Sequence, residues 1–194
     1  MVATPSMMLP LGTPMPEFSL VNAVDGRTLS SSELGGQAGT VVMFICNHCP
    51  FVKHVKEELG YLSNDYASHG VTFVAINSND VKQYPDDAPP RMKQLAEAQG
   101  WDFPYLLDET QEVAKAFKAA CTPDFFVFDG EQELVYRGQL DDSRPSNDIP
   151  VTGTDLRTAL DALLAGQPIS EEQKPSLGCN VKWKPGNEPE YFRP

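Results

Sequence analysis

The sequence lacks the features of several common classes of protein. No apolar run approaches the ~18 residues that a membrane-spanning helix needs, and residues 1–11 have neither the basic start nor the continuous apolar stretch of a secretory signal. Lysine and arginine number 15 against 27 aspartates and glutamates, which gives a net charge of −12. An acidic chain without a basic cluster is a poor candidate for binding nucleic acid or an anionic membrane. We therefore expect a cytoplasmic protein with neither kind of partner.

Cysteine and histidine are scarce as well, with four cysteines and three histidines in 194 residues. A structural zinc site usually takes two Cys-x-x-Cys or Cys/His pairs, and this sequence has one such pair, Cys46 and Cys49. In a reducing compartment, cysteines are more often catalytic or metal-binding than part of a permanent disulfide framework. We expect no resident metal and no bound cofactor, with a copper or zinc carrier kept as an alternative.

The chain does contain a Cys-x-x-Cys motif, between a predicted strand and a predicted helix. The apolar run of residues 41–45 predicts a buried strand, and it leads directly into Cys46-Asn47-His48-Cys49. An amphipathic helix follows, because apolar residues recur at spacings of three and four. Those residues are Phe51, Val55, Leu59, Leu62 and Tyr66. Two cysteines between a strand and a helix are typical of a redox-active disulfide.

The start of this helix predicts different roles for the two sulfurs. Asn47 as the N-cap and Pro50 in the first turn would place Cys46 at the positive end of the helix. Free backbone N–H groups and a protonated His48 would both favour the Cys46 thiolate, so we expect a pKa of roughly 5–6.5 for this thiol. Cys49, inside the first turn, is expected to be the more buried sulfur. The alternative for both is simple burial as small apolar side chains.

The rest of the chain predicts a mixed α/β order. Residues 17–22 and 27–29 flank Asp25-Gly26 and predict a β-hairpin. Further strands are expected at 40–45, 71–76, 103–107, 125–128 and 134–137, and helices at 50–68, 91–99, 109–119 and 154–165. The polar, proline-rich residues 77–90 are predicted to be a loop. We expect one domain over residues 1–194, with a core at about 14–166 and an irregular C-terminal tail at 167–194.

Three segments carry a resemblance to a known family. They are residues 46–54, the sequence Cys121-Thr122-Pro123-Asp124 before a strand, and residues 178–184. Together they resemble the thioredoxin/peroxiredoxin superfamily over nearly the whole chain, and more narrowly its peroxiredoxin-like branch of alkyl hydroperoxide reductase/thiol-specific antioxidant-type proteins. The resemblance implies a thioredoxin-like fold, in which helices flank a central mixed β-sheet, here with an N-terminal β-hairpin extension.

The resemblance also implies roles for Thr122 and Pro123. Pro123 would be a cis-proline facing the two cysteines, and the backbone of Thr122 would be free to contact an extended substrate. Without the resemblance, an ordinary trans turn before a strand is the alternative, since only ~5–6% of X-Pro bonds are cis.

The sequence departs from the peroxiredoxin pattern at the positions that act on peroxide. That pattern places Pro-x-x-x-Thr-x-x-Cys around a cysteine that aligns with Cys49, whereas this chain has Val42 in place of the proline and Cys46 in place of the threonine. Thr122-Pro123-Asp124 occupies the region of the expected arginine. Reduction of peroxide needs donors aimed at the scissile O–O bond, so we expect poor peroxidase activity.

These observations predict a thiol–disulfide oxidoreductase in which Cys46 attacks and Cys49 resolves the mixed disulfide. The catalytic residues would be Cys46, Cys49, His48, Thr122 and Pro123. A weak thiol peroxidase, and a thioredoxin-like carrier of copper or zinc, are the alternatives. The expected partners are protein or small-molecule disulfides and thiols, with a reductant of thioredoxin or glutathione type.

Two further cysteines are candidates for an auxiliary redox role. Cys121 directly precedes Thr122, and Cys179 lies in the tail near lysines that could lower the pKa of its thiol. A buried structural thiol is the alternative for each of them.

Overall fold

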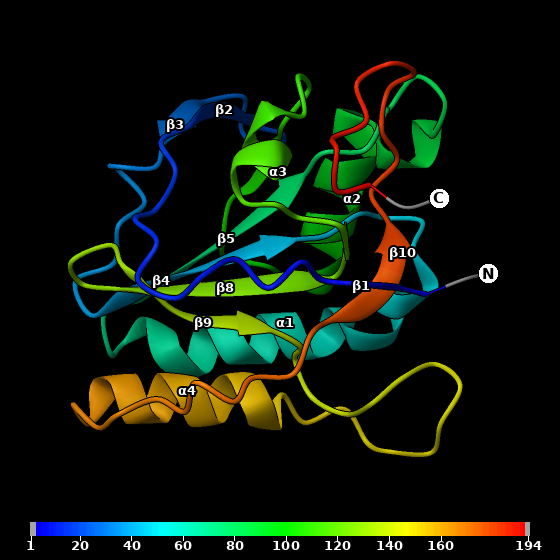
Figure 1. The fold of residues 1–194 in the computed structure, drawn as a ribbon. Helices are drawn as coiled ribbons and strands as arrows, with labels where there is room; N and C mark the ends of the chain where they lie inside the picture. The colour runs from blue at the N-terminus through cyan, green and yellow to red at the C-terminus, as the bar shows by residue number, and fades with distance from the viewer. Residues whose placement is uncertain (1–2, 193–194) are drawn as a thin grey trace.

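The predicted strands and helices form a mixed β-sheet with helices on both faces (Figure 1), in a computed structural model that describes residues 3–192. The strands of this sheet are β2 (Ser19–Asn22), β3 (Thr28–Ser30), β4 (Gly39–Phe44), β5 (Val71–Asn77), β6 (Tyr105–Leu107), β8 (Asp124–Asp129) and β9 (Leu134–Gly138). Their spatial order within the described residues is β3-β2-β6-β5-β4-β8-β9. β4, β5 and β6 run parallel, and β8 runs antiparallel to β4 and β9. This is the thioredoxin-like arrangement that the sequence predicted.

Helices pack on the sheet in two layers. They are α1 (Pro50–Ala67), α2 (Pro89–Gln99), α3 (Glu112–Ala116) and α4 (Thr154–Leu164), with a short 3₁₀ helix, η1, at Pro85–Asp87. α1 and α4 cover one face of the sheet, and α3 lies on the other (Figure 1). α1 therefore packs on the face of the sheet to which Val41 and Met43 of β4 contribute their side chains.

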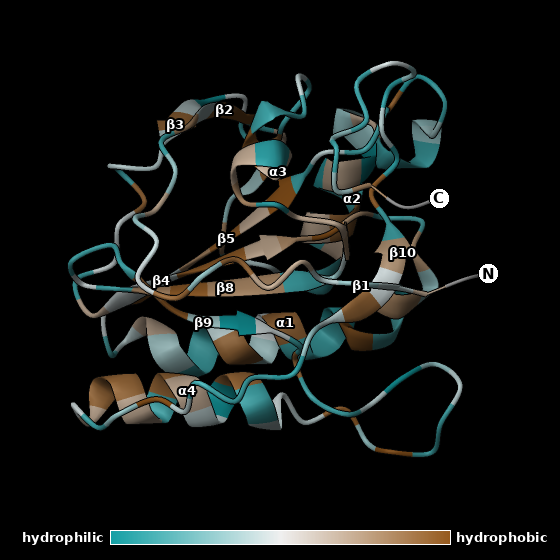
Figure 2. Ribbon diagram, in the orientation of Figure 1, coloured by the Kyte–Doolittle hydropathy of each residue, from teal (hydrophilic) through white to brown (hydrophobic). Residues whose placement is uncertain are grey.

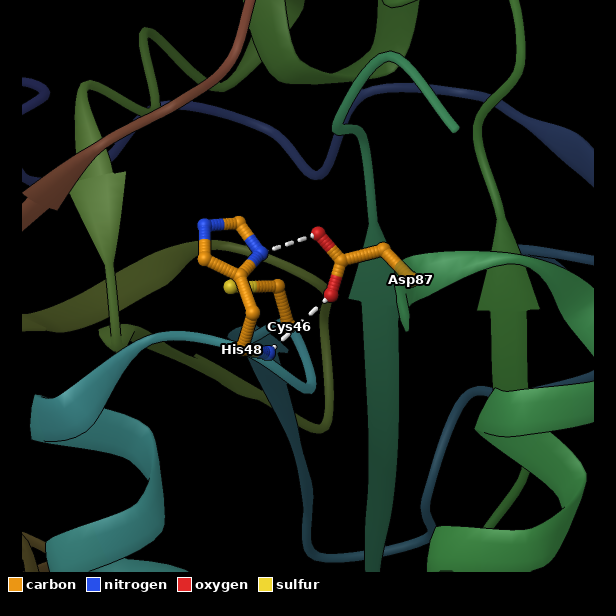
Figure 3. A group of neighbouring side chains, drawn as sticks. All are labelled: Cys46, His48 and Asp87. Carbon is orange, nitrogen blue, oxygen red and sulfur yellow. Dashed lines mark hydrogen bonds and ion pairs between the residues drawn. The ribbon is translucent and has the colours of Figure 1, made fainter. Parts of the chain in front are cut away.

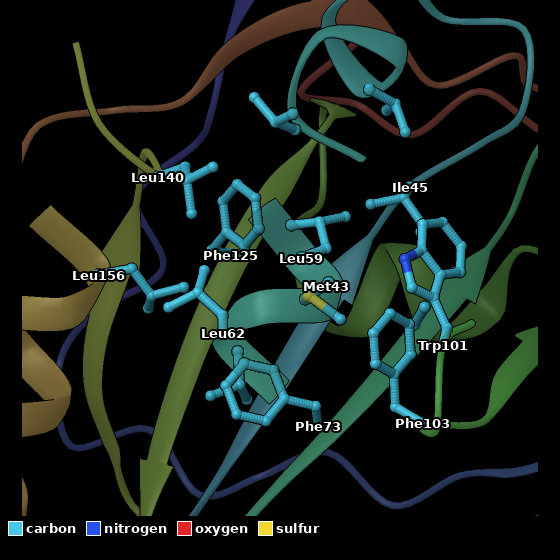
Figure 4. Close-up of a cluster of buried hydrophobic side chains, with 14 of the residues drawn as sticks. Met43, Ile45, Leu59, Leu62, Phe73, Trp101, Phe103, Phe125, Leu140 and Leu156 are labelled. Carbon is cyan, nitrogen blue, oxygen red and sulfur yellow. The ribbon is translucent and has the colours of Figure 1, made fainter. Parts of the chain in front are cut away.

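The central strand β4 is buried along its whole length because both of its faces are covered. Side chains alternate across a strand, so Val41 and Met43 join the apolar cluster under α1, while Val42 and Phe44 join the cluster under α3. Figure 4 shows Met43 close to Leu59 of α1 in the first cluster, and the central strands are largely apolar in Figure 2. Burial on two sides explains a continuous apolar run where a half-exposed strand would alternate.

The N-terminal hairpin is confirmed. β2 and β3 pair antiparallel around the Asp25-Gly26 turn, with Leu20 opposite Leu29, and β2 also pairs with β6 at the edge of the main sheet. The hairpin therefore extends the sheet on the side away from β9. No helix in residues 3–192 is long and apolar enough to cross a membrane.

Two of the predicted helix boundaries are wrong. α2 begins at Pro89, inside the predicted loop, because proline is tolerated in a first helical turn whose N–H groups lack partners. α3 covers only Glu112–Ala116 of the predicted 109–119. Gln111 and Lys118 have φ values of 67° and 51°, and a left-handed residue at each side prevents the helix from extending.

The prediction of an irregular C-terminal tail is also wrong. Strand β10 (Leu177–Asn180) lies between β1 (Thr4–Pro5) and β7 (Cys121–Thr122) in a second sheet of three strands. Val181 and Trp183, which follow β10, are buried in the apolar cluster on the α3 side. The residues of the tail show no periodic pattern, because the conformation of β10 depends on pairing with strands more than 50 residues away in the chain.

Candidate active site

Both cysteines of the motif lie in the segment that joins β4 to α1. Cys49 is fully buried, Cys46 is 1% exposed, and both are free thiols. Cys49 is the N-cap residue of α1, so the prediction of Asn47 as the N-cap is wrong. The Asn47 side chain instead accepts a hydrogen bond of 3.1 Å from the Tyr105 hydroxyl. The helix therefore presents its free N–H groups two residues later than expected, at Cys49.

Thr122 and Pro123 face the two thiols. The Thr122–Pro123 peptide bond is cis, as the resemblance implied. Cys46 Sγ lies 3.4 Å from Thr122 Oγ1, and the Cys49 thiol donates to the Thr122 backbone oxygen at 3.2 Å. A single residue thus contacts both sulfurs.

The backbone of Thr122 is not free, in contrast to the prediction. β10 pairs antiparallel with β7, with Cys179 opposite Thr122 and Asn180 opposite Cys121. Gly178 packs so closely that an added Cβ would lie 2.0 Å from the Thr122 oxygen. The strand edge at which an extended substrate was expected is therefore occupied by the protein's own C-terminal segment.

His48 is held by an aspartate that the sequence did not identify. His48 Nδ1 lies 2.6 Å from Asp87 Oδ2, and the other carboxylate oxygen accepts the backbone N–H groups of Asn47 (2.7 Å) and His48 (3.2 Å), as Figure 3 shows for the two bonds to His48. Asn79 Nδ2 donates a further bond of 2.8 Å to Oδ2. The ring of Tyr84 stacks on that of His48 at a centroid distance of 5.2 Å. Asp87 is fully buried, so its carboxylate fixes the Cys-x-x-Cys turn as well as the imidazole.

The local sequence contains no pattern that predicts the contact between Asp87 and His48. Asp87 follows an exposed aspartate, Asp86, in a polar segment between prolines, and its partner His48 lies 39 residues upstream. A signal that could have found it is the pairing of an acidic segment after β5 with a histidine at the end of β4, because parallel neighbouring strands end at the same edge of a sheet.

The pKa values of the Cys46 and Cys49 thiols are in the opposite order to the prediction. Burial raises the pKa of Cys46 well above its ordinary value, and the hydrogen bond with Cys49 and the negative charge of Asp87 raise it further. The pKa of Cys49 is lowered, first by a hydrogen bond with Cys179, then by the one with Cys46, and also by the backbone N–H of Val52. The predicted pKa of roughly 5–6.5 for Cys46 is therefore wrong in direction. The first proton to leave the dithiol leaves its charge on Cys49.

Comparison with family profiles identifies the family of this chain. The profile of the Redoxin family matches residues 10–156, about three quarters of the chain. The chain belongs to the Redoxin family. No curated protein sequence matches it.

Solved structures agree with the fold of this Redoxin-family protein. An uncharacterized conserved protein from Geobacillus kaustophilus is 61% identical, with a TM-score of 0.94 over 96% of this chain and 98% of that one. A thioredoxin-family thiol:disulfide interchange protein from Chlorobium tepidum has a TM-score of 0.61 at 23% identity, over 80% and 99% of the two chains. A peroxidoxin from Mycobacterium tuberculosis has a TM-score of 0.61 at 18% identity, over 81% and 97%. The protein therefore has a thioredoxin-like fold.

The two remaining cysteines of this Redoxin-family protein differ in their position. Cys179 is 3% exposed and lies within hydrogen-bonding reach of Cys49, so the structure brings it to the motif. Cys121 is fully buried and contacts the Pro123 oxygen at 3.8 Å. Burial raises its pKa, and the nearby Asp124 raises it further. A neutral, buried thiol is typical of a structural cysteine.

Cys46, His48 and Asp87 are also ligand types for a metal ion. One ligand atom from each lies within 4.8 Å of the others. A closed structural zinc site takes four ligands, however, and this set offers three. A metal would also have to replace the His48–Asp87 contact and the bond from Asn79 to the same carboxylate oxygen. The donor set therefore fits an ion pair better than a metal site.

Proposed function

We propose that this protein is a thiol–disulfide oxidoreductase whose redox centre is the pair Cys46 and Cys49. The observation that carries the proposal is the arrangement of both sulfurs on Thr122, with the N-terminus of α1 directed at Cys49. A thiolate at a helix N-terminus is stabilised by unpaired N–H groups. The solved neighbour described as a thiol:disulfide interchange protein supports the same activity.

Cys46 is proposed as the sulfur that forms the mixed disulfide. It lies next to His48, whose side chain is 22% exposed, whereas Cys49 is enclosed by Thr122 and Cys179. In the oxidised protein, a substrate thiolate attacks Cys46 Sγ, the bond between Cys46 and Cys49 breaks, and Cys49 leaves as a thiolate. A second substrate thiol then attacks the substrate sulfur, and Cys46 leaves and takes up that thiol's proton. The substrate becomes a disulfide, and the reduced protein carries a thiol on Cys46 and a thiolate on Cys49.

The low pKa of Cys49 favours reduction of the Cys46–Cys49 disulfide and therefore oxidation of the substrate. A thiol of low pKa is a good leaving group, so attack on Cys46 is fast. Stabilising the thiolate also stabilises the reduced protein, which makes its disulfide a stronger oxidant. The charge of Asp87 disfavours a second thiolate on Cys46. In the reverse direction, Cys49 resolves a mixed disulfide on Cys46, which keeps the roles that the sequence predicted.

The partners follow from this chemistry. Protein or small-molecule thiols and disulfides are the proposed substrates, and a thiol reductant of thioredoxin or glutathione type regenerates the dithiol. The proposed location is the cytoplasm, in which both reductants act.

Disulfide mapping of the oxidised protein tests the proposal. In a glutathione redox buffer, the wild-type protein should form one disulfide, between Cys46 and Cys49. Cys49→Ser should accumulate a mixed disulfide on Cys46, and Cys46→Ser should accumulate much less. Cys121→Ser is the matched control, because it removes a buried thiol that lies outside the pair, and it should map as the wild type does. Absence of a bond between Cys46 and Cys49 in the wild type would reject the proposed function.

A thiol peroxidase is the second candidate, and the position of Cys49 favours it. Cys49 aligns with the peroxidatic cysteine of peroxiredoxins, and its pKa is lowered by the hydrogen bond with Cys179 and the other donors around it. Attack of its thiolate on hydrogen peroxide would form a sulfenic acid and release hydroxide, and Cys46 would then condense with it to form the disulfide and water. The missing proline, threonine and arginine of the peroxiredoxin pattern make this reaction the slower of the two.

A further inference from the structure

The C-terminal strand β10 carries a third thiol to the redox pair. In the register between β10 and β7, Cys179 lies opposite Thr122. Cys49 Sγ is 3.2 Å from the backbone oxygen of that same Thr122. The two sulfurs therefore meet at one residue, and Cys179 forms a hydrogen bond with Cys49.

Contacts on both sides of Cys179 hold it in this place. On the N-terminal side, the Ser176 backbone N–H donates to Ser6 Oγ at 3.0 Å, and Gly178 lies against the Thr122 oxygen with no room for a side chain. On the C-terminal side, the Val181 N–H donates to the Ala120 oxygen at 3.0 Å and the Lys182 N–H to Asn79 Oδ1 at 2.8 Å. The position of the thiol is therefore set by the backbone of β10 and its neighbours.

We propose that Cys179 is a positioning residue, whose S–H group donates to the Cys49 sulfur of the reduced pair and thereby raises the reduction potential of the Cys46–Cys49 disulfide. The inference rests on the proposed function, because it concerns the potential of that same pair.

The physical reason lies in the difference between the two redox states. A thiol is a weak donor to a neutral acceptor, but a hydrogen bond to an ionised acceptor is shorter and roughly twice as strong. In the reduced protein, Cys179, Cys46, the Thr122 side chain and the Val52 N–H donate to the Cys49 thiolate, whereas the negative end of the Thr122 carbonyl dipole faces it. In the disulfide, the Cys49 sulfur carries no charge and accepts only weakly. The donor therefore stabilises the reduced state more than the oxidised state.

A redox role for Cys179 makes a different prediction. In that case, the Cys179 thiolate would attack Cys49 in the Cys46–Cys49 disulfide, a bond between Cys49 and Cys179 would form, and Cys46 would leave and take up the proton that Cys179 had lost. Serine cannot take part in this exchange, but its hydroxyl can donate a hydrogen bond. Serine and alanine at position 179 therefore separate a donor from an exchange partner.

The experiment compares wild type, Cys179→Ser and Cys179→Ala. Two quantities are measured: the equilibrium constant with glutathione, and the pKa of Cys49 from thiolate absorbance near 240 nm. The alanine variant should raise the pKa of Cys49 by about one unit, and its disulfide should be about tenfold harder to reduce, which corresponds to about 30 mV. The serine variant should stay within about twofold of the wild type. Urea unfolding of all three proteins, with Cys121→Ala as the control for loss of a buried thiol, separates this shift from a general loss of stability.

Two outcomes would overturn the inference while leaving the proposed function intact. If Cys179→Ala has the wild-type potential, the thiol does not tune the pair. If Cys179→Ser behaves like Cys179→Ala and the wild type contains a mapped bond between Cys49 and Cys179, Cys179 is an exchange partner and not a donor. Absence of the Cys46–Cys49 disulfide from the wild type would instead reject the function on which the inference rests.

Discussion

Replacing Asp87 by asparagine should destabilise the protein and change the chemistry of the motif. The carboxylate is fully buried and accepts four hydrogen bonds, two from His48, one from Asn47 and one from Asn79. Asparagine keeps the shape but has one acceptor oxygen, and its NH₂ group would face donors in place of the other oxygen. Two of the four bonds would therefore be lost.

The size of the effect follows from these contacts. Removing one partner of a fully buried ion pair costs roughly 3–5 kcal/mol, but the His48 side chain is 22% exposed, and water can replace part of the lost contact. We expect the free energy of unfolding to fall by about 2–3 kcal/mol at pH 7, which agrees with about 1.5–3 kcal/mol for a hydrogen bond to a charged group.

The pKa of Asp87 determines how the loss of stability in Asp87→Asn should change with pH. Burial alone would raise the pKa of Asp87, but the hydrogen bonds from His48 and Asn79 outweigh it, so the pKa is lowered. A carboxylate with a lowered pKa contributes stability above its unfolded value of about 3.9, and this contribution is lost as the pH falls through the folded value. The difference between wild type and Asp87→Asn should therefore shrink in acid, as the pH falls below about 3.9 and through the lowered pKa of Asp87.

Urea unfolding of the reduced proteins at pH 7 and at pH 3 measures this difference, and Asp86→Asn, which changes the exposed neighbour, is the matched control. In the same variant, the pKa of Cys46 should fall, since the negative charge beside it is gone. A variant as stable as the wild type at pH 7, or a loss that is equally large at pH 3, would refute the reasoning.

Three other predictions concern the thiols and β10. The reduction potential should change by about 30 mV per pH unit near pH 7, because Cys49 stays ionised and only Cys46 takes up a proton on reduction; a slope of about 60 mV per unit would show that both sulfurs are protonated. Stopped-flow oxidation by hydrogen peroxide should be far slower than about 10⁷ M⁻¹s⁻¹, and a rate near that value would make peroxide the main substrate. Gly178→Ala should displace β10 from Thr122, because its Cβ would lie 2.0 Å from the Thr122 oxygen; faster alkylation of Cys49 reports the displacement, and an unchanged rate contradicts it.

The sequence by itself determined the elements that depend on local pattern. The run of residues 41–45, buried on both sides, predicted β4, and the apolar spacing after Pro50 predicted α1. The Asp25-Gly26 turn predicted the hairpin of β2 and β3. In each case, neighbours within a few residues decide the conformation, so the pattern is visible before any tertiary contact is known.

Only the tertiary structure decided which sulfur carries the charge. The start of α1 lies at Cys49, two residues beyond the predicted cap, so the N–H groups of the helix serve the other cysteine. Asp87 reaches Cys46 from the 3₁₀ helix η1 after β5, and Cys179 reaches Cys49 from β10. The pKa of a buried thiol depends on the charges and donors packed around it. Here these come from segments that lie far apart in the sequence: the parallel pairing of β4 with β5 brings Asp87 to the motif, and the pairing of β10 with β7 brings Cys179.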